Sequence, residues 1–257
     1  MTDPKTWFNL SGKCALITGS YRGIGYAMAE ALGKAGAQVI INGRSEEGVA
    51  KAVESLKAEG VQATGKCFDV SDEAAVNQAV EEIERDIAPI NILINNAGIQ
   101  DRNPITELEL AQWENVLKVN LTGPFILTKA VAQRMIPRKW GKIINICSVI
   151  SQVARPTISN YAASKGAIVM LTKSMAIEWA QHNIQVNGIG PGYIATELNT
   201  SLVEDKEFNA WICNRTPAGR WGTPEDLAGA ALFLSSEAAN FVSGHILYVE
   251  GGLLSSL

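Results

Sequence analysis

The chain has 257 residues, of which 47% are hydrophobic and 19% are charged, and its formal net charge is −4. This composition is typical of a soluble globular protein with one large core. The acidic balance and the lack of basic runs argue against a nucleic-acid-binding protein. No apolar stretch is long enough to cross a membrane.

Cysteines and histidines are few and scattered. The four cysteines show no C-x-x-C spacing, which favours reduced thiols. The two histidines, His182 and His245, lie far apart in the sequence, so we expect no metal site. The first five residues lack the apolar core of a secretory signal. Together these features favour a cytoplasmic protein.

Short apolar runs alternate with longer helical patterns in chain order. We expect strands at residues 14–18, 38–41, 63–68, 90–95, 142–147, 185–189 and 245–249. We expect helices at residues 26–32, 46–58, 73–86, 113–135, 161–181 and 224–234. Strands joined by helices pair in parallel, and their Val- and Ile-rich runs indicate burial on both faces. The sequence therefore predicts an α/β fold, a Rossmann-like doubly wound parallel sheet of about seven strands with helices on both faces. Without a linker or repeat, residues 1–257 form one predicted domain.

A glycine-rich stretch follows the first predicted strand. Gly19, Gly23 and Gly25 lie between that strand and the next helix, with the spacing G-x-x-x-G-x-G. Glycine permits a tight turn and a close approach of phosphate to backbone N–H groups, and the helix N-terminus adds a positive dipole end. The alternative is a turn required only for packing of the strand against the helix. Binding of a dinucleotide is the functional hypothesis, although the common spacing is G-x-G-x-x-G.

Further motifs occur at the expected ends of later strands. Residues 95–98 read Asn-Asn-Ala-Gly, Ser148 ends the fifth strand, and residues 161–165 read Tyr-Ala-Ala-Ser-Lys. With Asn120, Pro191 and Gly192, these motifs resemble the short-chain dehydrogenase/reductase family from about residue 10 to the C-terminus. The resemblance implies a catalytic set of Asn120, Ser148, Tyr161 and Lys165. It also implies that the cofactor is bound by Gly19, Ser20, Arg22, Gly23, Ile24, Gly25, Arg44, Asp69, Val70, Asn96, Ala97, Gly98, Tyr161, Lys165, Pro191, Gly192, Ile194 and Thr196.

The chemistry of the Tyr-x-x-x-Lys pair can be argued from its spacing. Tyr161 and Lys165 are four residues apart and share one helix face. A nearby ammonium favours the phenolate, so it lowers a tyrosine pKa from its usual value near 10. Tyr161 could then protonate a ketone whose oxygen is held by Ser148, while a nicotinamide delivers hydride. A lone Tyr-x-x-x-Lys is usually structural, and a non-enzymatic dinucleotide sensor on this fold is the alternative of another class.

The end of the second strand predicts the cofactor. NAD-binding proteins of this fold usually carry an acidic residue there, which contacts the ribose hydroxyls. Here residues 41–44 read Ile-Asn-Gly-Arg. Arg44 and Arg22 suit a 2′-phosphate instead, so we expect NADP(H). The alternative is that both arginines are solvated surface groups.

The substrate segment is expected at about residues 192–222. The chain resembles the gluconate 5-dehydrogenase branch of the family, also called 5-keto-gluconate reductase, which implies interconversion of 5-keto-D-gluconate and D-gluconate. Ile150, Gln152 and Asp101 depart from the polar pattern of that branch. A less polar ketone, a ketoester or a 3-oxoacyl substrate is therefore the alternative. The expected substrate-binding residues are Ser148, Ile150, Gln152, Arg102, Arg155, Tyr193 and Trp211.

Two further expectations concern assembly and proton transfer. Residues 244–249 form an apolar edge strand, which proteins normally cover, and the resemblance implies a homotetramer. Pro124 lies four residues after Asn120 and has no N–H, so the helix should be interrupted at Asn120. The freed Asn120 carbonyl could hold a water that also touches Lys165 and feeds protons to Tyr161.

Overall fold

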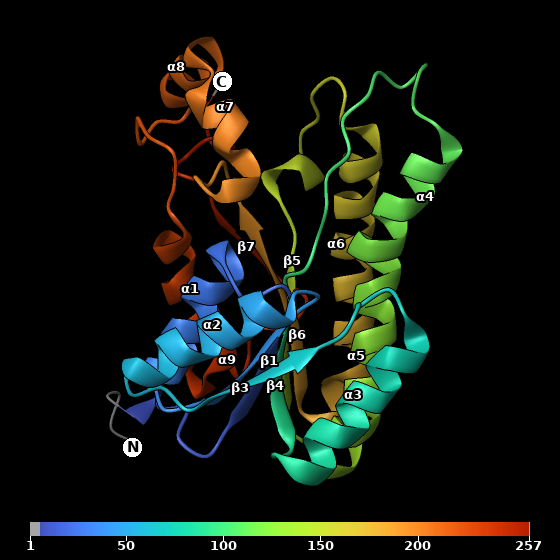
Figure 1. The fold of residues 1–257 in the computed structure, drawn as a ribbon, viewed down its shortest axis with the longest axis vertical. Coiled ribbons are helices and arrows are strands. Elements are labelled where there is room, and N and C mark those ends of the chain that lie inside the picture. Colours follow the sequence, from blue (N-terminus) through green and yellow to red (C-terminus); the bar gives the residue numbers. More distant parts are fainter. Residues whose placement is uncertain (1–5, 257) are drawn as a thin grey trace.

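The computed structural model describes residues 6–256 and contains a seven-stranded sheet in the order β3-β2-β1-β4-β5-β6-β7 (Figure 1). Every neighbouring pair is parallel. The strands are β1 (Cys14–Ile17), β2 (Gln38–Gly43), β3 (Ala63–Cys67), β4 (Ile90–Asn95), β5 (Gly141–Ile146), β6 (Ile184–Pro191) and β7 (Ile246–Val249). The Rossmann-like sheet predicted from the sequence is thereby confirmed.

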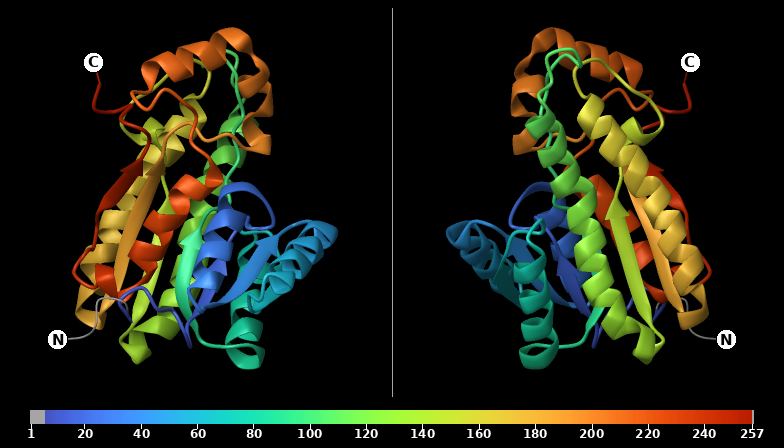
Figure 2. Two further views of the ribbon diagram at one scale, coloured as in Figure 1. Left: turned by 90° about the vertical axis from the view of Figure 1, so that its left-hand side faces the viewer. Right: turned by 90° about the vertical axis from the view of Figure 1, so that its right-hand side faces the viewer.

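Helices cover both faces of the sheet. The α-helices of the described residues are α1 (Gly23–Lys34), α2 (Glu46–Ala58), α3 (Glu73–Asp86), α4 (Leu110–Leu117), α5 (Gly123–Arg138), α6 (Ser159–Trp179), α7 (Thr200–Glu204), α8 (Lys206–Arg215) and α9 (Ala228–Ser235). Figures 1 and 2 show α1, α2 and α9 on one face and α3, α5 and α6 on the other. The first helix begins at Gly23, three residues earlier than expected, because the glycine loop itself enters the helix.

Alternate residues of β1 belong to two different cores. Ala15 and Ile17 pack with the helices on one face, and Cys14 and Leu16 pack with those on the other. All four are buried, which explains why the strand has no polar alternation. Strand β1 pairs with β2 on one side and with β4 on the other, so the strand order reverses there. Ligands bind at such a switch point, beyond the carboxyl ends of the strands.

The helix expected at residues 113–135 is interrupted, as Pro124 predicts. A π-helical segment, Lys118–Thr122, separates α4 from α5, and Asn120 lies within it. The amide of Gly123 donates to the carbonyl of Lys118, five residues earlier. Such one-turn expansions are frequent at functional sites. The segment turns the Asn120 side chain toward the loop that follows β4.

The segment between β6 and β7 leaves the sheet and returns through a narrow neck. Ile194 and Gly222 form an isolated parallel bridge. The Ala195 amide donates to the Gly222 carbonyl at 2.9 Å, and the Gly222 amide donates to the Tyr193 carbonyl at 2.9 Å. Helices α7 and α8 lie beyond this neck, above the carboxyl ends of the strands (Figure 2).

One charged side chain lies inside the sheet core. Lys142 of β5 is fully buried, and its amine donates to Asn240 Oδ1 at 2.8 Å. Burial lowers the pKa of Lys142 to about 8, and the charge of Glu237 opposes that shift in part. The group lies far along the strand from the carboxyl edge, so it belongs to the scaffold.

The cysteines are unpaired, and they differ in exposure. Cys14 and Cys147 are buried, Cys213 is partly exposed and Cys67 is exposed. Within residues 6–256, every helix is too short or too polar to span a membrane.

Candidate active site

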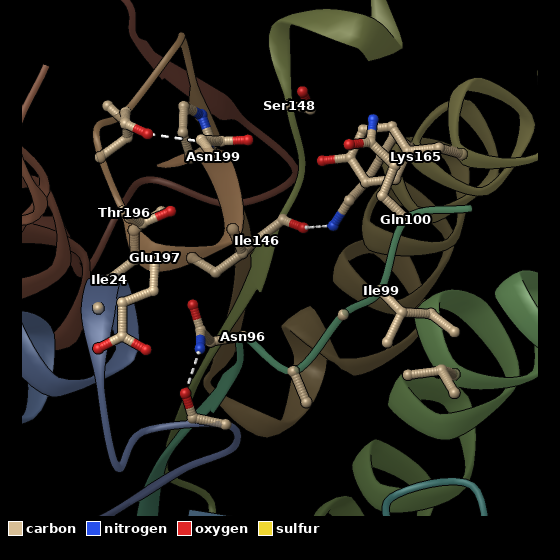
Figure 3. Close-up of a pocket in the computed structure, with 18 of the residues that line it drawn as sticks. Ile24, Asn96, Ile99, Gln100, Ile146, Ser148, Lys165, Thr196, Glu197 and Asn199 are labelled. Carbon is tan, nitrogen blue, oxygen red and sulfur yellow. Dashed lines mark hydrogen bonds between the residues drawn. The ribbon is translucent and has the colours of Figure 1, made fainter. Parts of the chain in front are cut away.

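A cavity of about 570 Å³ opens at the carboxyl ends of the strands. It runs from the glycine-rich loop to the substrate segment, and Figure 3 draws part of its lining. The residues predicted from the sequence that line it are Gly19, Arg22, Gly23, Ile24, Arg44, Asp69, Val70, Asn96, Ala97, Gly98, Arg102, Ser148, Ile150, Arg155, Tyr161, Lys165, Pro191, Gly192, Tyr193, Ile194 and Thr196. Five other predicted residues lie outside the lining: Ser20, Gly25, Asn120, Gln152 and Trp211.

The glycine-rich loop is compact because side chains would not fit. Gly19 has φ +58° and Gly23 has φ +57°, both in the region that favours glycine. A Cβ at Gly25 would lie 2.5 Å from the Gly19 carbonyl oxygen and 2.6 Å from Asn96 Nδ2. Asn96 Nδ2 in turn donates to the carbonyls of Thr18 and Gly19, each at 2.9 Å.

The N-terminus of α1 is open for an anion. Helices α2 and α3 are capped by the side chains of Ser45 and Asp72, which accept from first-turn amides. Arg22 at the start of α1 forms no such side-chain cap. Uncapped first-turn amides and the helix dipole suit a phosphate, so the residues present fit a dinucleotide pyrophosphate.

Ser20 and Asn42 tie the glycine loop to the second strand. The Ser20 hydroxyl donates to the Ile17 carbonyl at 2.7 Å and accepts from the Asn42 amide at 3.0 Å. Asn42 Nδ2 donates to the carbonyls of Lys66 and Phe68, each at 3.1 Å. The Ser20 side chain is thus directed into the loop rather than into the cavity. Asn42 was not among the predicted site residues. The only sign of its role in the sequence is that a polar residue stands at the end of a buried strand.

The adenosine end of the cavity contains the two predicted arginines. Arg44 Nη1 lies 3.8 Å from Asp69 Oδ2, and Arg22 forms an ion pair with Glu197 of the substrate segment. Burial opposes ionisation of Asp69, but hydrogen bonds from Ser71 and the charge of Arg44 outweigh it and lower its pKa. The guanidinium groups of Arg22 and Arg44 both lie at the cavity wall. An additional anion could contact them there.

Tyr21 explains why no carboxylate occupies the end of β2. A Cβ at Gly43 would lie 2.4 Å from Tyr21 Cδ1, and one at Gly48 would lie 2.8 Å from Tyr21 Cδ2. The Arg22 guanidinium carbon lies 5.2 Å from the centre of the Tyr21 ring. An acidic side chain at position 43 would have to displace this ring. Tyr21 itself was missed in the sequence.

Ser148, Tyr161 and Lys165 come together below the substrate segment. Ser148 lies two residues beyond the end of β5, while Tyr161 and Lys165 lie on α6. Lys165 is buried, and its Nζ donates to the Ile146 carbonyl at 2.6 Å (Figure 3). That ammonium lies 5.6 Å from the centre of the Tyr161 ring. Ser148 Oγ accepts from the Ile150 amide at 3.1 Å. The three side chains line one part of the cavity, as the strand-end and helix-face arguments predict.

Asn120 lies behind this group rather than in the cavity lining. Its Oδ1 accepts from the Ile99 amide at 2.8 Å, and its Nδ2 donates to the Ile99 carbonyl at 2.9 Å. Nδ2 also donates to Ser164 Oγ at 3.2 Å. The asparagine therefore fixes the loop after β4 against α6. The water relay through its main-chain carbonyl stays a prediction.

The substrate end combines cations with aromatic rings. Arg102 and Arg155 both line the cavity. Burial and then the charge of Arg155 lower the pKa of Arg102. The Arg155 guanidinium carbon lies 4.9 Å from the centre of the Phe208 ring. Tyr193 contacts Phe208 and Trp221 edge-on, with ring centres 5.9 and 5.6 Å apart.

Trp211 and Gln152 lie at the periphery of this end. The Trp211 ring centre lies 5.5 Å from that of Phe208, so Trp211 supports the cluster from outside. Gln152 is exposed. The other lining residues that the sequence analysis did not assign to the site are Phe68, Ile99, Gln100, Asn115, Val119, Ile146, Cys147, Val149, Ile158, Glu197, Asn199 and Leu202.

A doubly wound sheet with a glycine-rich loop at its switch point and a Ser, Tyr, Lys group in the same cavity defines a dinucleotide-dependent dehydrogenase. Residues 13–207 match the family model described as short chain dehydrogenase. The chain belongs to this family.

Several relatives match almost the whole chain. A 5-keto-D-gluconate 5-reductase of Escherichia coli K12 is 55% identical over 96% of this chain and 97% of its own length. A gluconate 5-dehydrogenase of Gluconobacter oxydans is 52% identical over 97% of this chain and 98% of its own length. A crystal structure of a gluconate 5-dehydrogenase from Burkholderia cenocepacia, in complex with NADP and tartrate, matches with a TM-score of 0.95 and 51% identity over 98% of each chain.

Proposed function

We propose that this protein is an NADP(H)-dependent oxidoreductase that interconverts 5-keto-D-gluconate and D-gluconate. One observation carries the proposal: a single cavity joins the phosphate-binding loop, the Ser148, Tyr161 and Lys165 group, and a pair of arginines. The two relatives at 52–55% identity that bear the corresponding names support the same substrate. The relative crystallised with NADP supports the cofactor.

The chain's own residues would perform the proton chemistry. NADP(H), when bound along the glycine-rich loop, would supply a hydride to the carbonyl carbon in reduction and accept one from the carbinol carbon in oxidation. Ser148 donates a hydrogen bond to the ketone oxygen, and Tyr161 gives that oxygen its proton as reduction proceeds. Lys165, held by the Ile146 carbonyl, places its ammonium group beside the Tyr161 ring. Asn120 acts indirectly, because its side chain holds the backbone of Ile99 beside the reacting group.

Arg102 and Arg155 would bind the carboxylate of the sugar acid. Guanidinium groups bind carboxylates with paired hydrogen bonds, and two of them here share the wall of one cavity. The related structure with bound tartrate, itself a hydroxy dicarboxylate, supports an acid-binding subsite in this branch. Removal of either charge should raise KM for the acid more than it lowers kcat.

A reductase of less polar ketones is the second candidate. Ile150, two residues after Ser148, lines the cavity, and so does Tyr193, whose ring contacts that of Phe208. A panel of 5-keto-D-gluconate, a ketoester, an aryl ketone and a 3-oxoacyl thioester, each with NADPH, separates the candidates. We expect the highest kcat/KM for 5-keto-D-gluconate. A higher value for any other compound would transfer the assignment to its class.

We further propose a homotetramer in the cytoplasm. Strand β7 lies at the edge of the sheet, and the apolar side chains of Phe125 on α5 and of Met170 and Ile177 on α6 are exposed. Covering such surfaces in a closed assembly would stabilise them. Light scattering should give four times the chain mass at micromolar concentration. A monomer mass would contradict the assembly, and recovery from a membrane or secreted fraction would contradict the location.

A further inference from the structure

Thr157, between Arg155 and the start of α6, has an unusual backbone conformation. Its φ is +69°, in the left-handed region that β-branched residues rarely adopt. The residue is exposed, so side-chain burial does not force the conformation. Strained residues of this kind persist where surrounding structure holds them, and they cluster at functional sites.

The turn at Thr157 joins the two loops that carry the cavity arginines. The Thr157 carbonyl accepts a hydrogen bond from the Asn103 amide at 3.0 Å. Asn103 directly follows Arg102, and Thr157 follows Arg155 by two residues. Pro156 lies between them and restricts Arg155 to extended conformations. One main-chain hydrogen bond therefore fixes the backbones of both arginines relative to each other.

Arg102 and Arg155 have hydrogen-bond donors that no acidic side chain uses. Within residues 6–256, neither guanidinium forms an ion pair. Arg102 donates to the neutral amide oxygen of Gln100 at 3.2 and 2.9 Å, and Arg155 lies over the Phe208 ring. Like charges repel, so the two guanidinium groups do not hold each other in place. An anion in the cavity would bind both groups only while the main-chain hydrogen bond holds the two loops together.

The same turn also sets the distance to the reacting group. Ile158, directly after Thr157, is buried and lines the cavity. Its carbonyl accepts the Ala162 amide at 2.8 Å in the first turn of α6, where Tyr161 lies. The segment from Arg155 to Tyr161 is thus a short, rigid connection between an anion-binding group and a proton donor.

We propose that Thr157 is a positioning residue, whose left-handed turn holds Arg102 and Arg155 together as one site for the substrate carboxylate and sets its distance from Tyr161. The inference rests on the proposed function for its substrate class. It deepens that proposal, because it says that a strained turn outside the cavity positions the two arginines that recognise the acid.

Two substitutions at the turn separate its geometry from its side chain. Proline cannot adopt a positive φ, so Thr157→Pro should release the Asn103 amide. Asparagine tolerates the left-handed region, so Thr157→Asn should keep the turn with less strain. Lys139 at the end of α5 also has a positive φ of +51°, so Lys139→Asn is the matched control away from the cavity.

Four measurements are compared: KM for 5-keto-D-gluconate, kcat/KM for cyclohexanone as a ketone without a carboxylate, the Kd of tartrate, and Tm. Thr157→Pro should raise KM and the tartrate Kd on the order of tenfold, as for loss of one charge-assisted hydrogen bond. Its kcat/KM for cyclohexanone should stay unchanged. Thr157→Asn should keep the wild-type KM and Kd with a higher Tm, and Lys139→Asn should alter Tm alone.

A second route tests the same hydrogen bond if Thr157→Pro does not fold. Asn103→Pro removes the donor amide, and Asn103→Ala retains it while removing the side chain. Unchanged KM and tartrate Kd in both proline variants would overturn the inference and leave the proposed function intact. An equal loss with cyclohexanone would also overturn it, because general disruption would then explain the effect. Failure of the wild-type protein to bind tartrate or reduce the keto acid would instead refute the proposed function.

Discussion

The buried Lys142 makes a quantitative prediction about stability and pH. Its pKa is lowered by burial to about 8 in the folded protein, against 10.5 for the free group. Below pH 8 the lysine is charged in both states, and the folded state bears the desolvation cost. Above pH 10.5 it is neutral in both states, and that cost vanishes. The free energy of unfolding should therefore rise with pH between these values.

The size of this rise follows from the two pKa values. Each pKa unit corresponds to about 1.4 kcal/mol, so the Lys142 contribution is about 3 kcal/mol across the window. Lys142→Met removes this titration. It also removes the hydrogen bond to Asn240, which the lysine can donate both as an ammonium and as a neutral amine. The pH dependence of the difference between the two proteins, rather than its absolute value, isolates the lysine.

Urea unfolding at a fixed protein concentration, in steps from pH 7.5 to 10.5, measures that difference. Other ionisable groups titrate in both proteins and cancel. Lys57→Met, which removes an exposed lysine of α2, is the matched control and should give a constant difference from wild type. The wild-type protein should gain about 3 kcal/mol relative to Lys142→Met by pH 10.5. A difference that stays constant over this range would refute the reasoning.

Three further predictions concern turnover and cofactor choice. Tyr161→Phe should lower kcat at least about a hundredfold with NADPH binding retained, because the proton donor is lost while the ring remains; retained turnover in the folded variant would contradict the role. Arg44→Asp should reverse or greatly weaken the preference for NADPH over NADH in kcat/KM, since a carboxylate would repel the 2′-phosphate; equal efficiency of both cofactors in the wild-type enzyme would refute the premise. Glu197→Gln should lower the Kd of NADPH up to about fivefold, because the Glu197 carboxylate no longer competes with the cofactor for Arg22. Glu204→Gln on the same segment should leave this Kd unchanged. Identical Kd values in both variants would contradict the competition.

The sheet was predictable because each strand is short, apolar and followed by a helix. The strand-end motifs followed from it: once Gly19, Asn96 and Ser148 are assigned to parallel strand ends, they must meet at one edge. The interruption near Asn120 was also predictable, since Pro124 cannot donate to that carbonyl. These features depend on local sequence and on one topological rule.

The remaining site features depend on contacts between distant segments. The ion pair of Arg22 with Glu197 joins residues far apart in sequence, and no local pattern marks Glu197. Residues 41–44 carry no carboxylate, and the structure adds a reason that the sequence does not show: the Tyr21 ring occupies the space beside Gly43. The left-handed turn at Thr157 was not predicted, because β-branched residues normally disfavour it.

The bridge between Ile194 and Gly222 has a consequence for how substrate range can change over evolution or in the laboratory. The bridge closes the base of the segment that carries α7 and α8. A change in the length of that segment therefore need not move the strands on either side. Closing a longer loop over a fixed base adds little entropic cost, since that cost grows only with the logarithm of length. Residues 195–221 can therefore be exchanged, as one segment, for the corresponding segment of a relative. Grafting a segment from a relative between these two positions, with Thr196 and Glu197 retained beside the glycine-rich loop, should change which ketones fit while the cofactor half of the protein stays as it is.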